Sequence, residues 1–411
     1  VAWRISEEDF CKSIDFIDYL KLRAGYVATG NQEIGNYSFA SALTTIKYTF
    51  NDNPVNAVVP YVMPNPNVQW ESQKQLNLGF DASIINQRIS LVVDLYQKNT
   101  ENMLVPMAVP ILTGYSDVYV PFINAGEIVN KGIELTVTSH NLKDAFRWDT
   151  EFNISFNKNE VKSLNDTIPL PRGSVGFNQQ IARIEPGYPV DVFYGFVTDG
   201  IFQSQEEVET HALQVPGNDP YNRTSAGDIR FLDLNSDGII DDDDRTYIGN
   251  PNPDFIFSLN NRFEFKGFDL NIFLQGVYGS EIYNANRIWS EGMAIAYNQS
   301  LGTLDRWTGP ETSNSTPRAI FNDPNKNIRP SARFIEDGSY LRIKNVIFGY
   351  TLPGSLLEKI RIQSVRIYLS GTNLYTFTNY TGFDPEVGAN GIDLSTYPVT
   401  RTFSVGANLT F

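Results

Sequence analysis

The run of acidic and amide side chains at residues 233–244 is the segment whose residue types and spacing bear most directly on chemistry. Side-chain oxygens stand at loop positions 1, 3, 5, 9 and 12, glycine stands at position 6, and position 7 can offer its backbone carbonyl. This spacing matches an EF-hand loop, whose oxygen ligands suit calcium. The predicted metal ligands are Asp233, Asn235, Asp237, Ile239, Asp241 and Asp244.

Two features of this loop depart from an EF-hand. Position 12 is Asp244, which has a shorter reach than the usual glutamate, and no amphipathic helix pair flanks the loop. The alternative interpretation is an acidic surface turn formed by Asn-Ser-Asp-Gly. A calcium ion here would have a structural role, because it would hold together a connection of nearly a hundred residues.

Other kinds of chemistry find little support in the sequence. His140, His211 and Cys11 are the only histidines and the only cysteine, so neither a zinc or iron cluster nor a disulfide framework is expected. We find no nucleophile elbow, phosphate-binding glycine loop or histidine-centred triad. The sequence therefore favours a protein that is not an enzyme.

Composition narrows the possible classes of protein further. The 411 residues carry 32 Lys and Arg against 47 Asp and Glu, a formal charge of −15, which argues against a nucleic-acid partner. No apolar run approaches the roughly 18 residues that a membrane-spanning helix needs. The chain contains 27 Phe, 21 Tyr and 30 Gly, and it has few blocks of helix-forming residues, so an all-β fold is expected.

Alternation with period two predicts the strands. From residue 254, Phe255, Phe257 and Leu259 alternate with polar residues, and the pattern resumes after a turn at Lys266-Gly267. About ten strands follow this scheme, several of ten residues or more. A phase slip at Lys344-Asn345 predicts a β-bulge. The other strands are expected around residues 1–5, 20–26, 76–84, 89–95, 133–137, 146–156, 341–350, 365–369 and 403–411.

The connections alternate strictly between short and long. Short turns are expected near Asn86, Ser139, Lys266 and Pro353, whereas the intervening loops run for tens of residues. Long antiparallel strands with short turns on one rim, long loops on the other and one apolar face are typical of an outer-membrane β-barrel. A soluble β-sandwich, with the apolar rows between two sheets, remains the alternative, because periodicity cannot distinguish lipid from a dry core.

The barrel interpretation assigns a place to the polar rows and to the loop aromatics. Polar strand residues should line a watery lumen and hold a plug by ion pairs. Aromatics in the long loops should belong to the loop core or to a membrane-interface girdle, in preference to a substrate site. The lumen residues are Lys21, Arg23, Asp81, Asp94, Glu134, Arg147, Glu151, Asp269, Arg342 and Arg366, and the aromatics are Tyr283, Trp289, Tyr297 and Trp307.

A series of motifs resembles, in order, the SusC/RagA family of TonB-dependent outer-membrane transporters of Bacteroidota. They include LKLRAGYVATGN, NPNVQWESQKQLNLGFD, LVVDLYQKNTENML and NKGIELTV in the first part of the chain. They continue with GDIRFLDLNSDGIIDDDDRTYIGNPNPDF, LDRWTGPETSNSTPRA, SYLRIKNVIFGYTLP and YPVTRTFSVGANLTF. The resemblance covers almost the whole chain, and it identifies residues 1–411 as a C-terminal barrel portion.

The resemblance implies a function and a set of partners. The expected function is active import of an oligomeric nutrient, glycan or peptide, across the outer membrane. A SusD-like surface lipoprotein and the TonB energy-coupling complex are the expected partners. Family members also have a signal peptide, a plug domain and further barrel strands, none of which is expected within residues 1–411. About ten strands are slightly under half of a 22-stranded barrel.

The last residue, Phe411, continues the outward row of the final strand. The resemblance implies that the barrel assembly machinery recognises such a strand, so Phe411 is predicted to be an assembly signal as well as a lipid-facing side chain. The alternative from another functional class is a secreted calcium-dependent adhesin or glycan-binding β-domain. Substrate ligands could not be assigned from the sequence.

Overall fold

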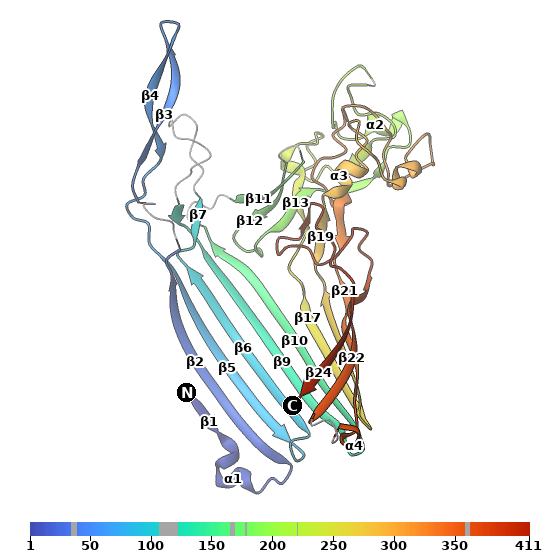
Figure 1. Ribbon diagram of the computed structural model, residues 1–411. Helices are drawn as coiled ribbons and strands as arrows, with labels where there is room; N and C mark the ends of the chain where they lie inside the picture. Colours follow the sequence, from blue (N-terminus) through green and yellow to red (C-terminus); the bar gives the residue numbers. More distant parts are fainter. Residues whose placement is uncertain (34–38, 107–121, 165–168, 177–178, 220, 358–361) are drawn as a thin grey trace.

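One curved antiparallel sheet of eleven strands forms the body of the molecule in the computed structural model (Figure 1). The structure describes residues 1–411 except 34–38, 107–121, 165–168, 177–178, 220 and 358–361. The strands are, in order across the sheet, β1 (Ala2–Arg4), β2 (Ile17–Asn31), β5 (Glu71–Ile84), β6 (Ile89–Glu101), β9 (Glu127–Lys143), β10 (Phe146–Ser163), β17 (Phe255–Phe265), β18 (Phe268–Tyr278), β21 (Tyr340–Thr351), β22 (Ser364–Thr378) and β24 (Thr402–Thr410).

The expected antiparallel barrel architecture is confirmed, and the barrel is not closed. Each strand pairs with its neighbour in chain order, and β1 and β24 form the two edges. β10 is 18 residues long and β9 is 17, whereas strands of soluble proteins centre near 5–6 residues. The predicted bulge is confirmed, since the register of β21 against β22 shifts between Ile343 and Asn345.

The short turns all lie at one end of the sheet. Lys266 and Gly267 have φ of 47° and 86°, the left-handed conformation that a two-residue hairpin turn requires. The turn expected at residues 139–144 is instead at Asp144 and Ala145, because β9 continues to Lys143. The polar Ser-His-Asn segment stays in the strand, where the side chains of His140 and Asp149 contact each other at 2.5 Å.

The long connections at the other end contain small elements of their own, which the alternation did not predict. One hairpin of β3 (Ala42–Phe50) and β4 (Asn53–Val62) stands apart beyond the rim of the sheet (Figure 1). The others are β7 (Leu104–Pro106), β8 (Phe122–Asn124), β11 (Leu170–Val175), β12 (Gln179–Ile184), β13 (Val192–Phe196), β14 (Thr198–Ile201), α2 (Gln205–Thr210), β15 (Ile229–Phe231), β16 (Arg245–Gly249), β19 (Glu281–Asn284), α3 (Asn286–Ser290), β20 (Ile335–Asp337) and β23 (Ile392–Asp393).

The helices are few and short. α1 (Asp9–Lys12) follows β1, and α4 (Gly354–Leu357) lies in the connection between β21 and β22. No helix in the described part of the chain is both long and apolar enough to cross a membrane.

The hydrophobic core lies in the loops, and the sheet leaves its own apolar face uncovered. A buried cluster joins Phe193, Tyr283 and Ile392 from three different connections. By contrast, Leu78, Leu95, Ile133 and Phe156 form a continuous row across β5, β6, β9 and β10, and each is 42–47% exposed. The sandwich interpretation is therefore wrong, because it would bury these rows against a second sheet.

Candidate functional site: the inner face and the loop layer

The polar face of the sheet carries ion pairs that cross from strand to strand. Arg23 on β2 donates to Asp81 on β5 at 2.7 Å and contacts Asp94 on β6 at 3.0 Å. Lys21 lies 4.0 Å from Asp81. The predicted inward residues of these three strands thus come together as one charged cluster.

A glycine makes this reach possible. Gly79 lies between Arg23 and Asp94 in the strand register, and a Cβ at Gly79 would collide with the Arg23 guanidinium. The same arrangement recurs where Arg366 on β22 crosses Gly349 on β21 and donates to Asp269 on β18 at 2.5 and 2.8 Å. Spanning three strands with one arginine fixes both register and side-chain position.

Tyr96 likewise crosses a glycine to contact the third strand. The ring of Tyr96 lies over Gly132, and its hydroxyl donates to Asn157 Oδ1 at 2.9 Å on the third strand. The inner face is therefore preorganised by contacts among its own residues.

Arg342 ties the inner face to a loop. Its guanidinium is 1% exposed and donates to Asp384 at 2.5 Å and Glu386 at 2.7 Å, both in the connection before β24. Thr376 Oγ1 accepts from its Nε at 2.9 Å. Removing one partner of such a buried ion pair costs about 3–5 kcal/mol, because the other charge is left uncompensated.

The remaining predicted lumen residues are less firmly held. Arg147 lies 3.6 Å from Glu264, and Glu151 accepts from Asn153 at 3.3 Å. Glu134 lies directly opposite Asp94 in the register. Ion pairing with a plug stays a prediction for all of these side chains.

The predicted calcium loop lies between β15 and β16 and is closed by its own hydrogen bonds. Asp233 accepts from the amides of Ser236 at 2.7 Å and Gly238 at 2.9 Å. Asp244, fully buried in the short 3-10 helix η4 (Asp242–Asp244), accepts from the amides of Leu234 and Asp241 at 2.7 and 3.0 Å.

The same pattern continues around the turn. Asn235 Oδ1 accepts from the amide of Asp237, and Asp237 Oδ1 accepts from the amide of Ile239. Asp241 accepts from the amide of Asp243. The oxygen-rich donor set suits a hard cation, but among the described residues no three His, Cys, Asp or Glu side chains are grouped to hold a metal ion. Calcium at this loop stays a prediction.

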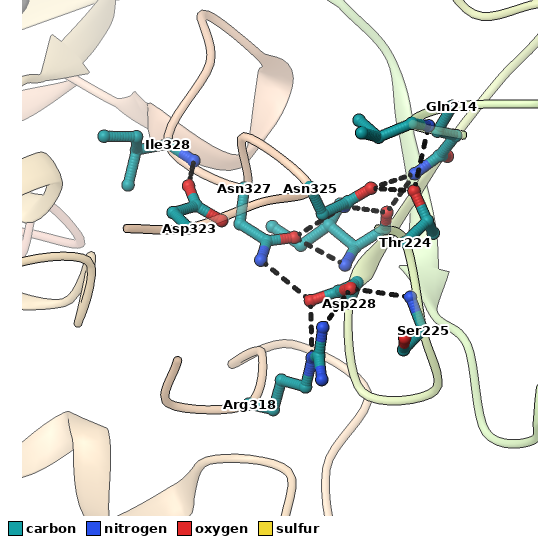
Figure 2. Close-up of polar contacts among 11 residues, drawn as sticks. Gln214, Thr224, Ser225, Asp228, Arg318, Asp323, Asn325, Asn327 and Ile328 are labelled. Atoms are coloured by element: carbon teal, nitrogen blue, oxygen red, sulfur yellow. Dashed lines mark hydrogen bonds and ion pairs between the residues drawn. The ribbon is translucent and has the colours of Figure 1, made fainter. Parts of the chain in front are cut away.

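A buried polar network, which the sequence did not predict, joins two long connections above the sheet (Figure 2). Asp228, fully buried, accepts from Arg318 at 2.9 Å, from Asn327 Nδ2 at 3.1 Å and from the amide of Ser225 at 2.8 Å. Asn325 donates to Asn327 Oδ1 at 2.8 Å. Periodicity carries no signal for these residues, although asparagine is dense in the 322–327 segment.

Tyr283, Trp289 and Trp307 are buried or half-buried in this layer, in agreement with the interpretation as loop core, whereas Tyr297 is 57% exposed. Tyr283 is fully buried, and its ring packs 5.6 Å from that of Phe334. Trp289 and Tyr297 meet edge to face at 5.4 Å. Trp307 Nε1 donates to Gln203 Oε1 at 3.1 Å.

Phe411 follows the last residue of β24 and is 79% exposed. Phe403, Val405 and Leu409 of the same strand are 53–77% exposed. This environment agrees with the predicted outward row, and recognition of Phe411 by an assembly machinery stays a prediction.

Comparison with known proteins identifies this architecture. A family model described as TonB dependent receptor-like, beta-barrel, matches residues 9–200. A TonB-dependent receptor of Formosa agariphila is 36% identical over 100% of this chain. The structure of the RagAB peptide transporter superposes with a TM-score of 0.81 at 25% identity, again over 100% of this chain. The chain is a SusC/RagA-like TonB-dependent receptor β-barrel.

The TonB-dependent receptor SusC of Bacteroides thetaiotaomicron is 26% identical over 100% of this chain. The receptor chain spans 39–42% of the length of these relatives. Their names describe receptors and transporters, in keeping with a protein that is not an enzyme. The family and the exposed apolar rows place the receptor in the cell outer membrane as a multi-pass β-barrel.

Proposed function

We propose that the receptor takes part in active import of an oligomeric nutrient, glycan or peptide, across the outer membrane. The observation that carries the proposal is the inner face, where ion pairs across strands give a charged wall while the outer face presents mostly apolar rows. Such a wall suits a wet lumen surrounded by lipid. The RagAB peptide transporter, which matches over the whole chain, supports the same function.

Two partners belong to this proposal. A SusD-like lipoprotein would cover the rim that carries the long loops, where Asp228 and Arg318 fasten two connections into one layer. The TonB complex would supply energy through parts of the transporter outside this chain. A secreted calcium-dependent adhesin gains no support, because a soluble domain would not expose the Leu78, Leu95 and Ile133 row.

Uptake of labelled oligomers tests the proposed function. Cells that lack the receptor gene should lose import of fluorescent oligosaccharides or oligopeptides, and loss of TonB should have the same effect. Import of a small sugar that crosses through porins is the control and should not change. Unchanged uptake of every labelled oligomer in the receptor-deficient strain would contradict the proposal.

A further inference from the structure

A polar pocket of about 380 Å³ lies in the loop layer, beside the buried network of Figure 2. β12, the end of β13, the calcium-loop segment and residues 326–330 contribute to its wall. Its cations are Arg245, Lys326 and Arg329, and its acids are Asp241 and Asp242. Three positive against two negative charges leave one net positive charge in a chain whose formal charge is −15.

Arg329 is the unusual member of this pocket. Its side chain is buried, with 7% exposed, and its guanidinium lies over the rings of Phe231 at 4.4 Å and Phe196 at 5.0 Å. It donates to the carbonyls of Asn325 at 2.7 Å and Lys326 at 3.2 Å. Within the described residues it has no carboxylate within 4.0 Å, and burial lowers its pKa to about 10.

A buried guanidinium without a carboxylate is costly unless something compensates its charge. Two carbonyl bonds use two of its five N–H donors. Arg245, by contrast, has a carboxylate partner, because its Nη1 lies 3.7 Å from Asp242. Asp323 and Asp242 act on the charge of Arg329 only from beyond ion-pair distance. Arg329 thus retains unused donors and room for a carboxylate partner at the wall of the pocket.

The buried network holds Arg329 in place. Asn325, whose carbonyl accepts from Arg329, receives hydrogen bonds on its own Oδ1 from Gln214 at 2.8 Å and Thr224 at 2.7 Å (Figure 2). Its Nδ2 donates to the carbonyl of Ile229 at 3.1 Å. A donor fixed before the ligand arrives loses little entropy on binding.

Three other groups at the pocket are available to bind a ligand. Lys326 is exposed, and Gln179 Oε1 and Arg245 Nε are buried atoms with no hydrogen-bond partner among the described residues. An amide acceptor and two further cationic side chains around a fixed guanidinium suit a carboxylate that is attached to other polar groups.

We propose that this pocket binds a carboxylate carried by an oligomer that the receptor imports, with Arg329 and Lys326 supplying the charge. Gln179 would accept from a hydroxyl or amide next to that carboxylate. The carboxylate could be that of a uronic acid sugar or the free C-terminus of a peptide. This inference rests on the proposed function, because it names the substrate class at a site on the receptor.

Binding to the full-length receptor in detergent tests the pocket. Calorimetry should compare tetragalacturonic acid with a neutral tetrasaccharide, and a tetrapeptide with its C-terminally amidated form. We expect one of the two acids to bind at least tenfold tighter than its neutral counterpart. The sugar pair and the peptide pair distinguish the two sources.

Variants assign that preference to the pocket. Arg329→Gln and Lys326→Gln should each reduce the preference at least fivefold. Because the Lys326 side chain is exposed, we expect its variant to fold normally. Lys47→Gln, on the distant β3 hairpin, is the matched charge control and should have no effect.

Two outcomes would overturn the inference. One is equal binding of acid and neutral forms in both pairs, including no binding at all. The other is a preference that survives both pocket substitutions. Neither outcome bears on the proposed function, which fails only if the receptor-deficient strain still imports labelled oligomers.

Discussion

Arg23 and Arg342 lie on the same polar face of the sheet and have different roles because their surroundings differ. Arg23 is a third exposed and holds two strand carboxylates, so water screens its charge and its pairs fix register. Arg342 is buried against Asp384 and Glu386 and fastens a loop to the sheet. At the scale of residues, burial decides which charged group is a structural clamp.

Calcium binding is the first prediction at this scale. Replacing Asp233 and Asp237 with Ala should abolish binding of millimolar calcium, measured by calorimetry on the full-length receptor, and should raise protease sensitivity in residues 159–253. The reason is that both side chains supply ligand oxygens in the predicted site. Glu209→Ala, an exposed acid on α2, is the control. A native receptor that takes up no ion would favour the acidic-turn interpretation.

Asp323 supports a prediction about pH. Burial raises its pKa, against hydrogen bonds from the amides of Asn327 and Ile328, and its Oδ1 is buried without a partner. A carboxyl with a raised folded pKa stabilises the fold below the unfolded value of about 3.9, and this contribution is lost as pH rises through the folded value.

Asp323→Asn removes that charge and retains an acceptor. We therefore expect the variant to unfold at a higher temperature than the native receptor at pH 7 and at a similar temperature at pH 4. Scanning calorimetry at both pH values measures this. Asp219→Asn, in an exposed turn, should show no such pH dependence. A variant that is less stable than the native receptor at pH 7 would contradict the assignment.

At the scale of elements, each strand has two faces that obey different requirements. The outward residues need only be apolar, since lipid accommodates many shapes. The inward residues must fit one another, because Arg23 lies where only glycine at position 79 leaves room. Substitution should therefore be tolerated unequally on the two faces.

Gly79→Val tests the inner face. The new side chain should push Arg23 away from Asp94 and destabilise the barrel by about 1–3 kcal/mol, the usual cost of overpacking. Gly25→Val is the matched control on the same face, because a Cβ there meets nothing within 4 Å. Heat-modifiable migration of the folded barrel on gels would measure both. Equal losses for the two variants would remove the special role of Gly79.

Leu270→Arg tests the outer face. Leu270 lies in the outward row of β18. An arginine there should cost about 2–4 kcal/mol if the residue lies near the bilayer midplane. Asn271→Arg, one residue on, faces the polar side and should cost much less. Denaturant titration in lipid vesicles provides the measurement. If Asn271→Arg cost more than Leu270→Arg, the assignment of the outward and inward faces would be wrong.

At the scale of the whole molecule, the receptor combines a sheet whose apolar rows face lipid with a loop layer that has its own core. The two parts have different requirements, since the sheet needs the membrane and the layer needs packing around Phe193 and Tyr283. Arg342 joins the sheet to the connection before β24.

Assembly is a prediction about the whole molecule. If the barrel assembly machinery reads Phe411, deleting it should lower the amount of receptor in the outer membrane well beyond any fall in melting temperature. Inserting Ser after Thr410 should do the same, because it displaces the outward row. Loss of lipid packing alone would cost at most about 1.5–3 kcal/mol and leave insertion largely intact. Normal membrane levels of both variants would refute a signal role.

The sequence by itself determined the sheet. Period two from Phe255 to Leu259, the Lys266-Gly267 turn and the bulge beside Lys344 all depend on neighbours in the chain, and all three are present in the structure. The alternation of short and long connections also predicted the rim that carries the loops. These features follow from local geometry, because a strand alternates its side chains whatever lies beyond it.

Only the tertiary structure decided the contacts of the loop layer and the partners across strands. Asp228 and Arg318 are 90 residues apart, and no periodic pattern relates them. Arg23 contacts Asp94 across the intervening strand only because Gly79 is its neighbour in the register. Strand pairing establishes that register. Contacts between distant residues arise from packing, and packing requires every neighbouring segment to be in place.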